Sequence, residues 1–486
     1  MRRHIFPFLA VLVLAATARS ETVETDEAEC WLPPFEVSEE TLRILEEINS
    51  VNAYQVPDLP MREDARYAHR PPELEPYRHV EPHVRHFLEQ MEYYGPRRAD
   101  PEPEHVDSVK FGFIGPIEAV PSVATGGVGD GLRMGVKKLQ GAKLAIEEAN
   151  ARGGYLRRDI PFEMVVRNDT GLWGSTGEMM IDLAYNEKVW GMLGTIDGAN
   201  THIAIRVGLK IEIPMMNSGN TDPTFIETNI PWVFRTIADD RKQSYLLVDY
   251  MYRERDLKRV GIIRSSNRYG RFGVRQIRDG SRRMGRPIAL EMAYRPGTED
   301  FSLQLERLRS ARVDGVVHWG DDDTGAAILN QMRAMGMDQP FFGCDRTVTD
   351  DFVRIAGENA EGVVAAFPWN PERDDPKLHA FYGRFRERFG EEAETYAAHA
   401  YDTMNMLIWA TQVAGLNRAK IRDVLAHRLE PWEGVTGQIE FSAVLDYIGE
   451  CYLARFENGR WNYYSREDLG LPVLVPSRDE QVATTD

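Results

Sequence analysis

The chain is 486 residues long, which exceeds one ordinary domain and predicts two lobes or more. A hydrophobic share of 43% beside 28% charged residues is typical of a folded globular protein. The formal net charge of −18 at pH 7 argues against nucleic acid or an anionic membrane as a partner, because an acidic surface repels both.

The first 20 residues have the pattern of a secretory signal. Two arginines precede the apolar stretch 5–16, which is too short to span a membrane. Cleavage fits after Ala18 or after Ser20, and removal of residues 1–20 changes the formal charge to −21 (55 basic against 76 acidic residues). No cysteine directly follows the apolar stretch, which argues against a lipid anchor. We expect an exported, periplasmic protein.

Residues 21–107 are rich in proline and acidic residues, as in PPFEVSEE and HRPPELEPY. This composition predicts an extension or linker with local structure, without a hydrophobic core of its own. We expect one helix around residues 39–51 and another around 80–93.

Three histidines near the end of this extension raise the question of a metal site. His79, His83 and His86 are spaced by four and three residues, which on one helical face could bind a metal ion. Pro82 interrupts the segment, and no cysteine or acid completes an obvious ligand set. We therefore favour solvated histidines and assign no metal and no cofactor.

From residue 109 onward, predicted strands alternate with predicted helices. The first set is strand 109–115, helix 139–154, strand 162–169, helix 177–187, strand 189–194, helix 200–208 and strand 213–217. The pattern then restarts with helix 245–255, strand 259–265, helix 272–285, strand 287–294, helix 301–311, strand 313–319, helix 326–336 and strand 340–343. Helices 376–389, 396–414 and 417–428 precede strands in 437–442 and 450–461. Two such sets predict an α/β protein with two doubly wound, Rossmann-like lobes.

The glycine-rich stretch TGGVGDGLRMG, residues 125–135, resembles a phosphate-binding loop only superficially. Leu132 and Met134 occupy the places of the third glycine in G-x-G-x-x-G, so we expect a flexible surface insertion. The chain also lacks G-x-S-x-G, a Walker loop, H-E-x-x-H and C-x-x-C. We therefore expect no enzymatic activity.

The order of nine segments resembles one known family: VKFGFIGPI, GAKLAIEEANARGG, VWGMLGTIDGANT, IPMMNSGNTDP, FRTIADDRKQ, SSNRYGRFG, VDGVVHWGDDDTGAAILNQMRAMGM, PFFGCD and AGENAEGVV. Together they make residues 108–465 similar to the solute-binding proteins of the branched-chain amino acid type, the periplasmic receptors of ABC importers. The resemblance implies two lobes joined by three hinge crossings, with a ligand cleft between them. It places lobe one at 108–238 with 366–436, lobe two at 239–365 with 437–465, and a C-terminal tail at 466–486.

The resemblance also implies a set of ligand-binding residues. In the loop TIDGANT, Gly198 stands where a serine is common in the family, so only its amide would hold the ligand carboxylate unless Asn200 or Thr201 replaces the serine. Gly219 and Thr221 match positions that contact the α-carbon substituents. Tyr269 matches the tyrosine that packs over the ligand backbone, and Asp345 matches the acid that pairs with the ligand ammonium.

Asp321 falls where the family often has an aromatic or small residue, and it begins a run of three acids before a predicted helix. Capping and dipole stabilisation explain at least one acid of the run 321–323. If Asp321 faces the cleft beside Asp345, the ligand would be more cationic than leucine: a basic amino acid, an amine or an amide. Glu118, at the end of the first predicted strand, also favours a cationic ligand. A divalent ion is a further alternative.

These features predict a receptor that captures a small amino-acid-like, amine or amide ligand by hinge closure and delivers it to an ABC permease. The long first loop, 119–136, and the extension depart from the family pattern. The alternative is therefore a secreted sensor or scaffold that reuses the fold, with residues 21–107 docking a partner. Deletion of 21–107 should then spare ligand affinity and abolish co-purification of that partner.

Overall fold

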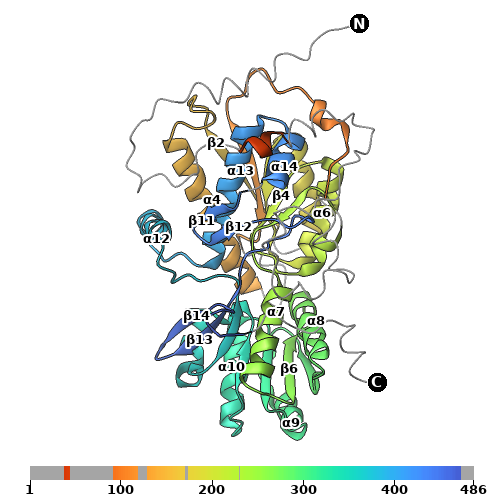
Figure 1. The fold of residues 1–486 in the computed structure, drawn as a ribbon, viewed down its shortest axis with the longest axis vertical. Helices are drawn as coiled ribbons and strands as arrows, with labels where there is room; N and C mark the ends of the chain where they lie inside the picture. The colour runs from red at the N-terminus through yellow and green to blue at the C-terminus, as the bar shows by residue number, and fades with distance from the viewer. Residues whose placement is uncertain are drawn as a thin grey trace.

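The computed structural model describes the chain over residues 38–43, 91–118, 128–169, 173–228, 230–428 and 430–471. These residues form two α/β lobes, which lie one above the other in Figure 1. The chain passes between the lobes three times, as predicted. No helix in the described part of the chain is long and apolar enough to cross a membrane.

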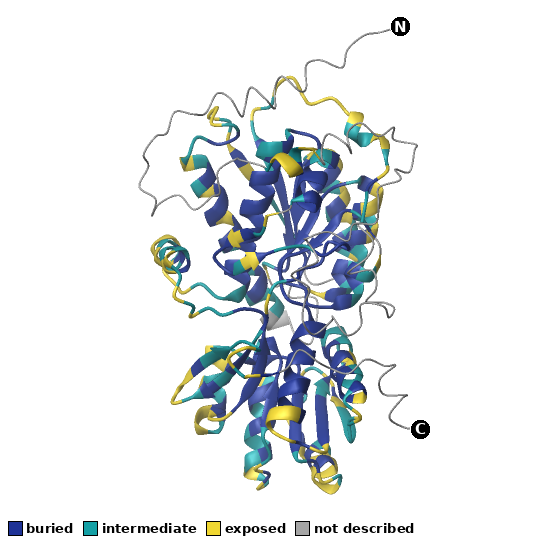
Figure 2. Ribbon diagram, in the orientation of Figure 1, coloured by how far each residue is buried: buried dark blue, intermediate teal, exposed yellow. Residues whose placement is uncertain are grey.

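Lobe one contains a parallel five-stranded sheet in the order β2-β1-β3-β4-β5. Its strands are β1 (Val109–Gly115), β2 (Phe162–Asn168), β3 (Gly191–Leu193), β4 (Met215–Asn217) and β5 (Val233–Arg235). Its helices are α4 (Val128–Ala151), α5 (Trp173–Ile181, continued by a π-helical turn over Asp182–Asn186), α6 (Gly198–Ile211), the short η5 (Pro223–Thr228), α12 (Pro376–Phe389), α13 (Thr395–Ala414) and α14 (Arg418–His427). Strand β1 is a near-continuous apolar run because helices cover both faces of this sheet (Figure 2).

Lobe two contains a seven-stranded sheet in the order β14-β13-β10-β9-β8-β6-β7, of which β13 and β14 are antiparallel. Its strands are β6 (Val260–Ser265), β7 (Leu290–Tyr294), β8 (Gly315–Trp319), β9 (Phe341–Gly343), β10 (Val364–Phe367), β13 (Tyr452–Glu457) and β14 (Arg460–Tyr464). Its helices are α7 (Asp240–Asp249, continued by a π-helical turn over Tyr250–Glu254), α8 (Arg268–Arg283), α9 (Ser302–Ser310), α10 (Asp322–Ala334), η7 (Asp345–Thr347), α11 (Asp350–Ala356) and η8 (Gly357–Ala360).

The second and third crossings begin a few residues later than the boundaries at 366 and 437. β10 belongs to the sheet of lobe two and ends at Phe367. The hairpin of β11 (Trp432–Gly434) and β12 (Gly437–Ile439) spans residue 437, and Asp402 of α13 fixes its turn by accepting the amides of Val435 and Thr436, each at 2.8 Å. The crossings lack a periodic sequence pattern, so the sequence alone does not locate their ends.

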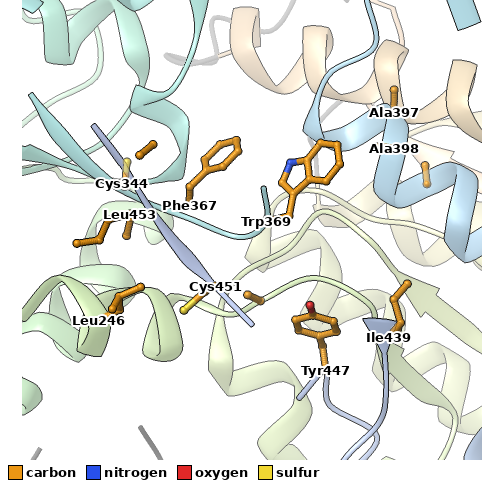
Figure 3. Close-up of a cluster of buried hydrophobic side chains, with 14 of the residues drawn as sticks. Leu246, Cys344, Phe367, Trp369, Ala397, Ala398, Ile439, Tyr447, Cys451 and Leu453 are labelled. Atoms are coloured by element: carbon orange, nitrogen blue, oxygen red, sulfur yellow. The ribbon is translucent and has the colours of Figure 1, made fainter. Parts of the chain in front are cut away.

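The hydrophobic core continues through these crossings. Trp369, just after β10, lies between Phe367 and the α13 residues Ala397 and Ala398 (Figure 3). Its indole also donates to the Thr395 hydroxyl of α13 at 3.1 Å. Apolar packing therefore connects the two lobes at the crossings.

The glycine-rich stretch 125–135 was predicted as a flexible surface insertion, and this is wrong from Val128 onward. Helix α4 begins at Val128, eleven residues before the predicted start. Gly135 lies inside the helix, where an added β-carbon would come within 1.8 Å of the Pro116 carbonyl oxygen. The glycine is therefore required by close packing of α4 against the end of β1, a role that composition cannot distinguish from flexibility.

Residues 91–107 form a strap that packs on lobe one. Tyr93 meets Trp232 edge to face with ring centroids 4.6 Å apart, and Arg98 pairs with Asp423 of α14 at 2.6 Å. The Asn417 side chain donates to the carbonyls of residues 97 and 100, at 2.9 and 3.0 Å. Most of this strap is irregular, with one short 3-10 helix, η3 (Pro96–Ala99). The end of the extension is thus part of the folded lobe.

Several predictions on the extension and the termini fall largely outside the described residues. These are the signal, the three histidines, most of the two helices predicted in the extension, and most of the C-terminal tail. The structure shows residues 39–43 as helical, in agreement with the first predicted helix. Residues 91–93, the described end of the second predicted helix, are not helical.

Candidate functional site

A cavity lies between the lobes, at the carboxyl ends of strands from both sheets, where doubly wound sheets bind ligands. It encloses about 20 Å³, room for about one water molecule. Its lining residues are Ile196, Asp197, Gly198, Gly219, Asn220, Thr221, Asp222, Arg268, Tyr269, Asp345, Arg346 and Tyr396. A ligand of amino-acid size therefore requires the lobes to move apart before it enters.

The lobe-one wall is built from two loops that end strands β3 and β4. Asp197 caps α6 by accepting the Ala199 amide at 2.7 Å, so Gly198 is the first residue of the helix. In the next loop, the Asn217 side chain accepts the amides of Gly219 and Asn220, at 3.0 and 2.8 Å. These amides are therefore bonded within the loops, and the positive pole of α6 lies at a wall that also carries Asp197 and Asp222.

The lobe-two wall is built from the start of α8 and the loop after β9. Asn267 caps α8 by accepting the Gly270 amide at 2.9 Å, which fixes Tyr269 in the first turn. The Tyr269 hydroxyl donates to one oxygen of the Asp345 carboxylate. The other oxygen faces the hydroxyl of Tyr396, from lobe one, at 3.5 Å. Asp345 is therefore held by one tyrosine from each lobe.

Five of the six predicted site residues line this cavity together, and Asp321 does not. The Asp321 carboxylate instead accepts a hydrogen bond from Nη1 of Arg346 at 2.6 Å. Asp321 occupies the N-cap position of α10, yet its side chain makes no capping bond. The Arg346 guanidinium lies over the Tyr269 ring, 3.8 Å from its centroid. Asp321 thus contributes to the site through an arginine that occupies the cleft.

The other acids singled out from the sequence lie elsewhere. Asp322 pairs with Arg133 of lobe one at 3.1 Å, and Asp323 is exposed at the first turn of α10. Glu118 is exposed and is not among the lining residues. Among the described residues, no group of three or more His, Cys, Asp or Glu side chains is arranged to hold a metal ion.

Arg268 and Arg346 are site residues that the sequence analysis missed. Arg268 reaches across the cleft to Asp222 at 2.8 Å, and its Nε would lie 2.8 Å from a β-carbon added at Gly198. The only available signal was position, because each arginine directly neighbours a predicted contact, Tyr269 or Asp345. Side chains that extend across the cleft depend on how the lobes meet, which the local pattern does not encode.

Two buried carboxyl groups interact at the floor of the cleft. Burial raises the pKa of Asp345, against the opposing effects of Arg346 and the Tyr269 hydroxyl. Burial and the Asp345 charge raise the pKa of Asp240, at the start of α7, well above its usual value, against the opposing Thr221 hydroxyl. A cationic group that enters beside Asp345 would relieve this repulsion.

A buried lysine stands behind the lobe-one loops. Lys138 of α4 donates to the Thr195 carbonyl at 3.1 Å, and its ammonium lies 3.5 Å from the place of a Gly219 β-carbon. Burial lowers its pKa to about 7, while Asp169 opposes the shift. A basic group therefore lies behind the lobe-one loops, and a buried acid, Asp345, lies in the lobe-two wall.

Comparison with known proteins identifies the family of this chain. Residues 109–456 match the model of a family described as periplasmic binding protein. Leu/Ile/Val-binding protein homolog 2 of Brucella abortus (strain 2308) is 26% identical over 332 residues, which cover 67% of this chain and 88% of the relative.

Solved structures show the same fold. The branched-chain amino acid transporter substrate binding protein LivJ from Streptococcus pneumoniae, in complex with isoleucine, superposes with a TM-score of 0.64 at 23% identity and covers 74% of this chain and 99% of its own. A solute binding protein of an ABC transporter from R. palustris, in complex with benzoate, has a TM-score of 0.64 at 16% identity, over 74% and 96% of the two chains. On its two lobes, its interlobe cavity and the match over residues 109–456, this chain belongs to the periplasmic binding protein family.

Proposed function

We propose that the protein is an extracytoplasmic receptor that binds an amino-acid-like ligand between its lobes and delivers it to an ABC permease. The observation that carries this proposal is the polarity of the cavity. One wall presents the N-terminus of α6, and the opposite wall presents Asp345 between two tyrosines. These walls match the carboxylate and the ammonium of an amino acid.

Closure of the two lobes would change the outer surface of the protein, and a permease could recognise that change. Lobe one would bind the ligand carboxylate first, and rotation about the three crossings would then bring Tyr269 and Asp345 over it. The ligand drives this motion only by binding the closed form more tightly than the open one. The names of the relatives support amino acids as the ligand class, and the N-terminal pattern supports export after removal of residues 1–20.

A thermal unfolding screen of the purified chain against amino acids, amines, amides and small carboxylates tests this function. A ligand at 100 times its dissociation constant should stabilise the fold by about 2.7 kcal/mol, which raises the unfolding midpoint. Asp345→Ala should weaken binding at least about tenfold, because the ligand ammonium loses a charged partner. Asp351→Ala, an exposed acid of α11, is the matched control and should leave binding unchanged.

Two results would count against the proposal. The first is a folded protein that no compound of the screen stabilises. The second is a ligand that binds Asp345→Ala and the unaltered chain equally well.

A further inference from the structure

Arg346 is a partly buried cation in the cleft, and only part of its hydrogen-bonding capacity is used. Nη1 donates to Asp321, and the guanidinium face covers the Tyr269 ring. Its Nε is buried and has no hydrogen-bond partner among the described residues. Arg346 also lines the cavity directly beside Asp345.

An unsatisfied charged donor in a closed cleft restricts what can lie next to it. An aliphatic ligand side chain would leave the Nε–H without water and without an acceptor, which is costly. A planar group with an oxygen acceptor would satisfy it, and guanidinium groups bind carboxylates in this way. Because Asp321 and Tyr269 already fix the guanidinium, little side-chain entropy remains to be lost on binding.

We propose that Arg346 is the specificity-determining residue of this cleft, and that the ligand is an amino acid whose side chain ends in a carboxylate or carboxamide. This inference rests on the proposed receptor function and narrows its ligand class. The ammonium of the ligand pairs with Asp345, its α-carboxylate faces the N-terminus of α6, and its distal oxygen accepts from Arg346. Asp321 acts as a positioning residue for the arginine.

The position of Asp321 changes the expectation of a more cationic ligand. That expectation required the Asp321 carboxylate to face the cleft as a second free acid. The ion pair with Arg346 neutralises it and presents a cation to the ligand instead. A basic side chain would meet a like charge at this point.

Calorimetric titration with L-glutamate, L-glutamine and L-leucine tests the inference. The unaltered chain should bind L-glutamate or L-glutamine at least about tenfold more tightly than L-leucine, because a site built to hydrogen-bond rejects a ligand without the acceptor. Arg346→Met should abolish or reverse this preference. Arg346→Lys keeps the charge without the planar fork and should reduce the preference. Arg354→Met, at an exposed arginine of α11, should leave it unchanged.

The outcomes separate this inference from the function on which it rests. A preference for L-leucine in the unaltered chain, or a polar preference that survives Arg346→Met, overturns the role of Arg346 and leaves the receptor function standing. Binding of none of the three, together with no hit in the thermal screen, overturns both. Should Arg346→Met fail to fold, Asp321→Asn removes the positioning partner, and the polar preference should fall in that variant too.

Discussion

Single glycines determine how closely the helices of lobe one approach their neighbours. Gly141 of α4 lies against α13, where an added β-carbon would come within 2.0 Å of the Ala397 carbonyl oxygen. A β-carbon added at Gly383 of α12 would have no neighbouring atom within 4 Å. The two residues are both helical glycines, and only one of them is required by packing.

Gly141→Ala should destabilise the fold by about 1 to 3 kcal/mol, because α4 and α13 must separate to admit the methyl group. Gly383→Ala should stabilise it by about 0.5 to 1 kcal/mol, because alanine restricts the unfolded chain more than glycine. Urea unfolding of the two variants provides the comparison. Equal effects of the same sign would contradict the packing role of Gly141.

Some residues of the site could be predicted from the sequence and others could not. Tyr269 and Asp345 directly follow apolar strands, so their place at the strand ends was predictable and they line the cavity. Arg346 was not identified, because nothing in CDRT distinguishes an arginine that turns into the cleft from one that is solvated. The role of Asp321 changed for the same reason, since its partner comes from another loop.

The strap over residues 91–107 is an element without secondary-structure periodicity. Glu92 lies between His427 at 3.1 Å and Arg422 at 3.5 Å, both in α14. Burial alone would raise the pKa of Glu92, but His427 and Arg422 lower it to about 2. The sequence could not predict this contact, because a proline-rich segment has no pattern that identifies the surface it covers.

Glu92→Gln should cost on the order of 3 kcal/mol of stability at neutral pH. Because the pKa is lower in the folded chain, this contribution is present above about pH 4.5 and is lost as pH falls through about 2. Urea unfolding at pH 7, 4 and 3 should therefore show a shrinking gap between the unaltered chain and the variant. Glu104→Gln, an exposed residue of the same strap, should change stability by less than about 0.5 kcal/mol. A difference in unfolding free energy that stays the same at all three pH values would contradict the role of the ion pair.

Regular elements of the lobes were mostly predicted correctly, because strands and helices alternate with clear apolar patterns. The exceptions are the start of α4, where glycines suggested a loop, and the short elements β5, β10, β11 and α11, which were not predicted. Gly135 at the start of α4 is required by its contact with Pro116, a tertiary requirement that overrides helix propensity.

In the molecule as a whole, two ion pairs join the lobes. Arg268 of lobe two pairs with Asp222 of lobe one at 2.8 Å, and Arg133 of lobe one pairs with Asp322 of lobe two at 3.1 Å. These contacts, together with the Tyr396 hydroxyl of lobe one at Asp345, connect the two walls of the cleft. Their geometry follows from the relative position of the lobes, so no local sequence pattern predicted them.

Removal of one such pair should shift the hinge toward the open form. Arg133→Ala should cost the closed form about 1 kcal/mol, which changes the open-to-closed ratio about fivefold. Small-angle X-ray scattering should show a larger radius of gyration for this variant. Arg388→Ala, which breaks the pair with Glu147 within lobe one, should leave the radius unchanged. Equal radii for both variants would mean that the interlobe pair does not stabilise closure.

The central claim is that the cleft recognises both charged ends of a free amino acid. Its most direct test is calorimetric titration of the purified chain with the amino acid that raises its midpoint most, beside the amide and the N-acetyl derivative of that amino acid. Each derivative should bind at least about tenfold more weakly, because one lacks the carboxylate at α6 and the other lacks the ammonium at Asp345. Equal dissociation constants for all three compounds would contradict it.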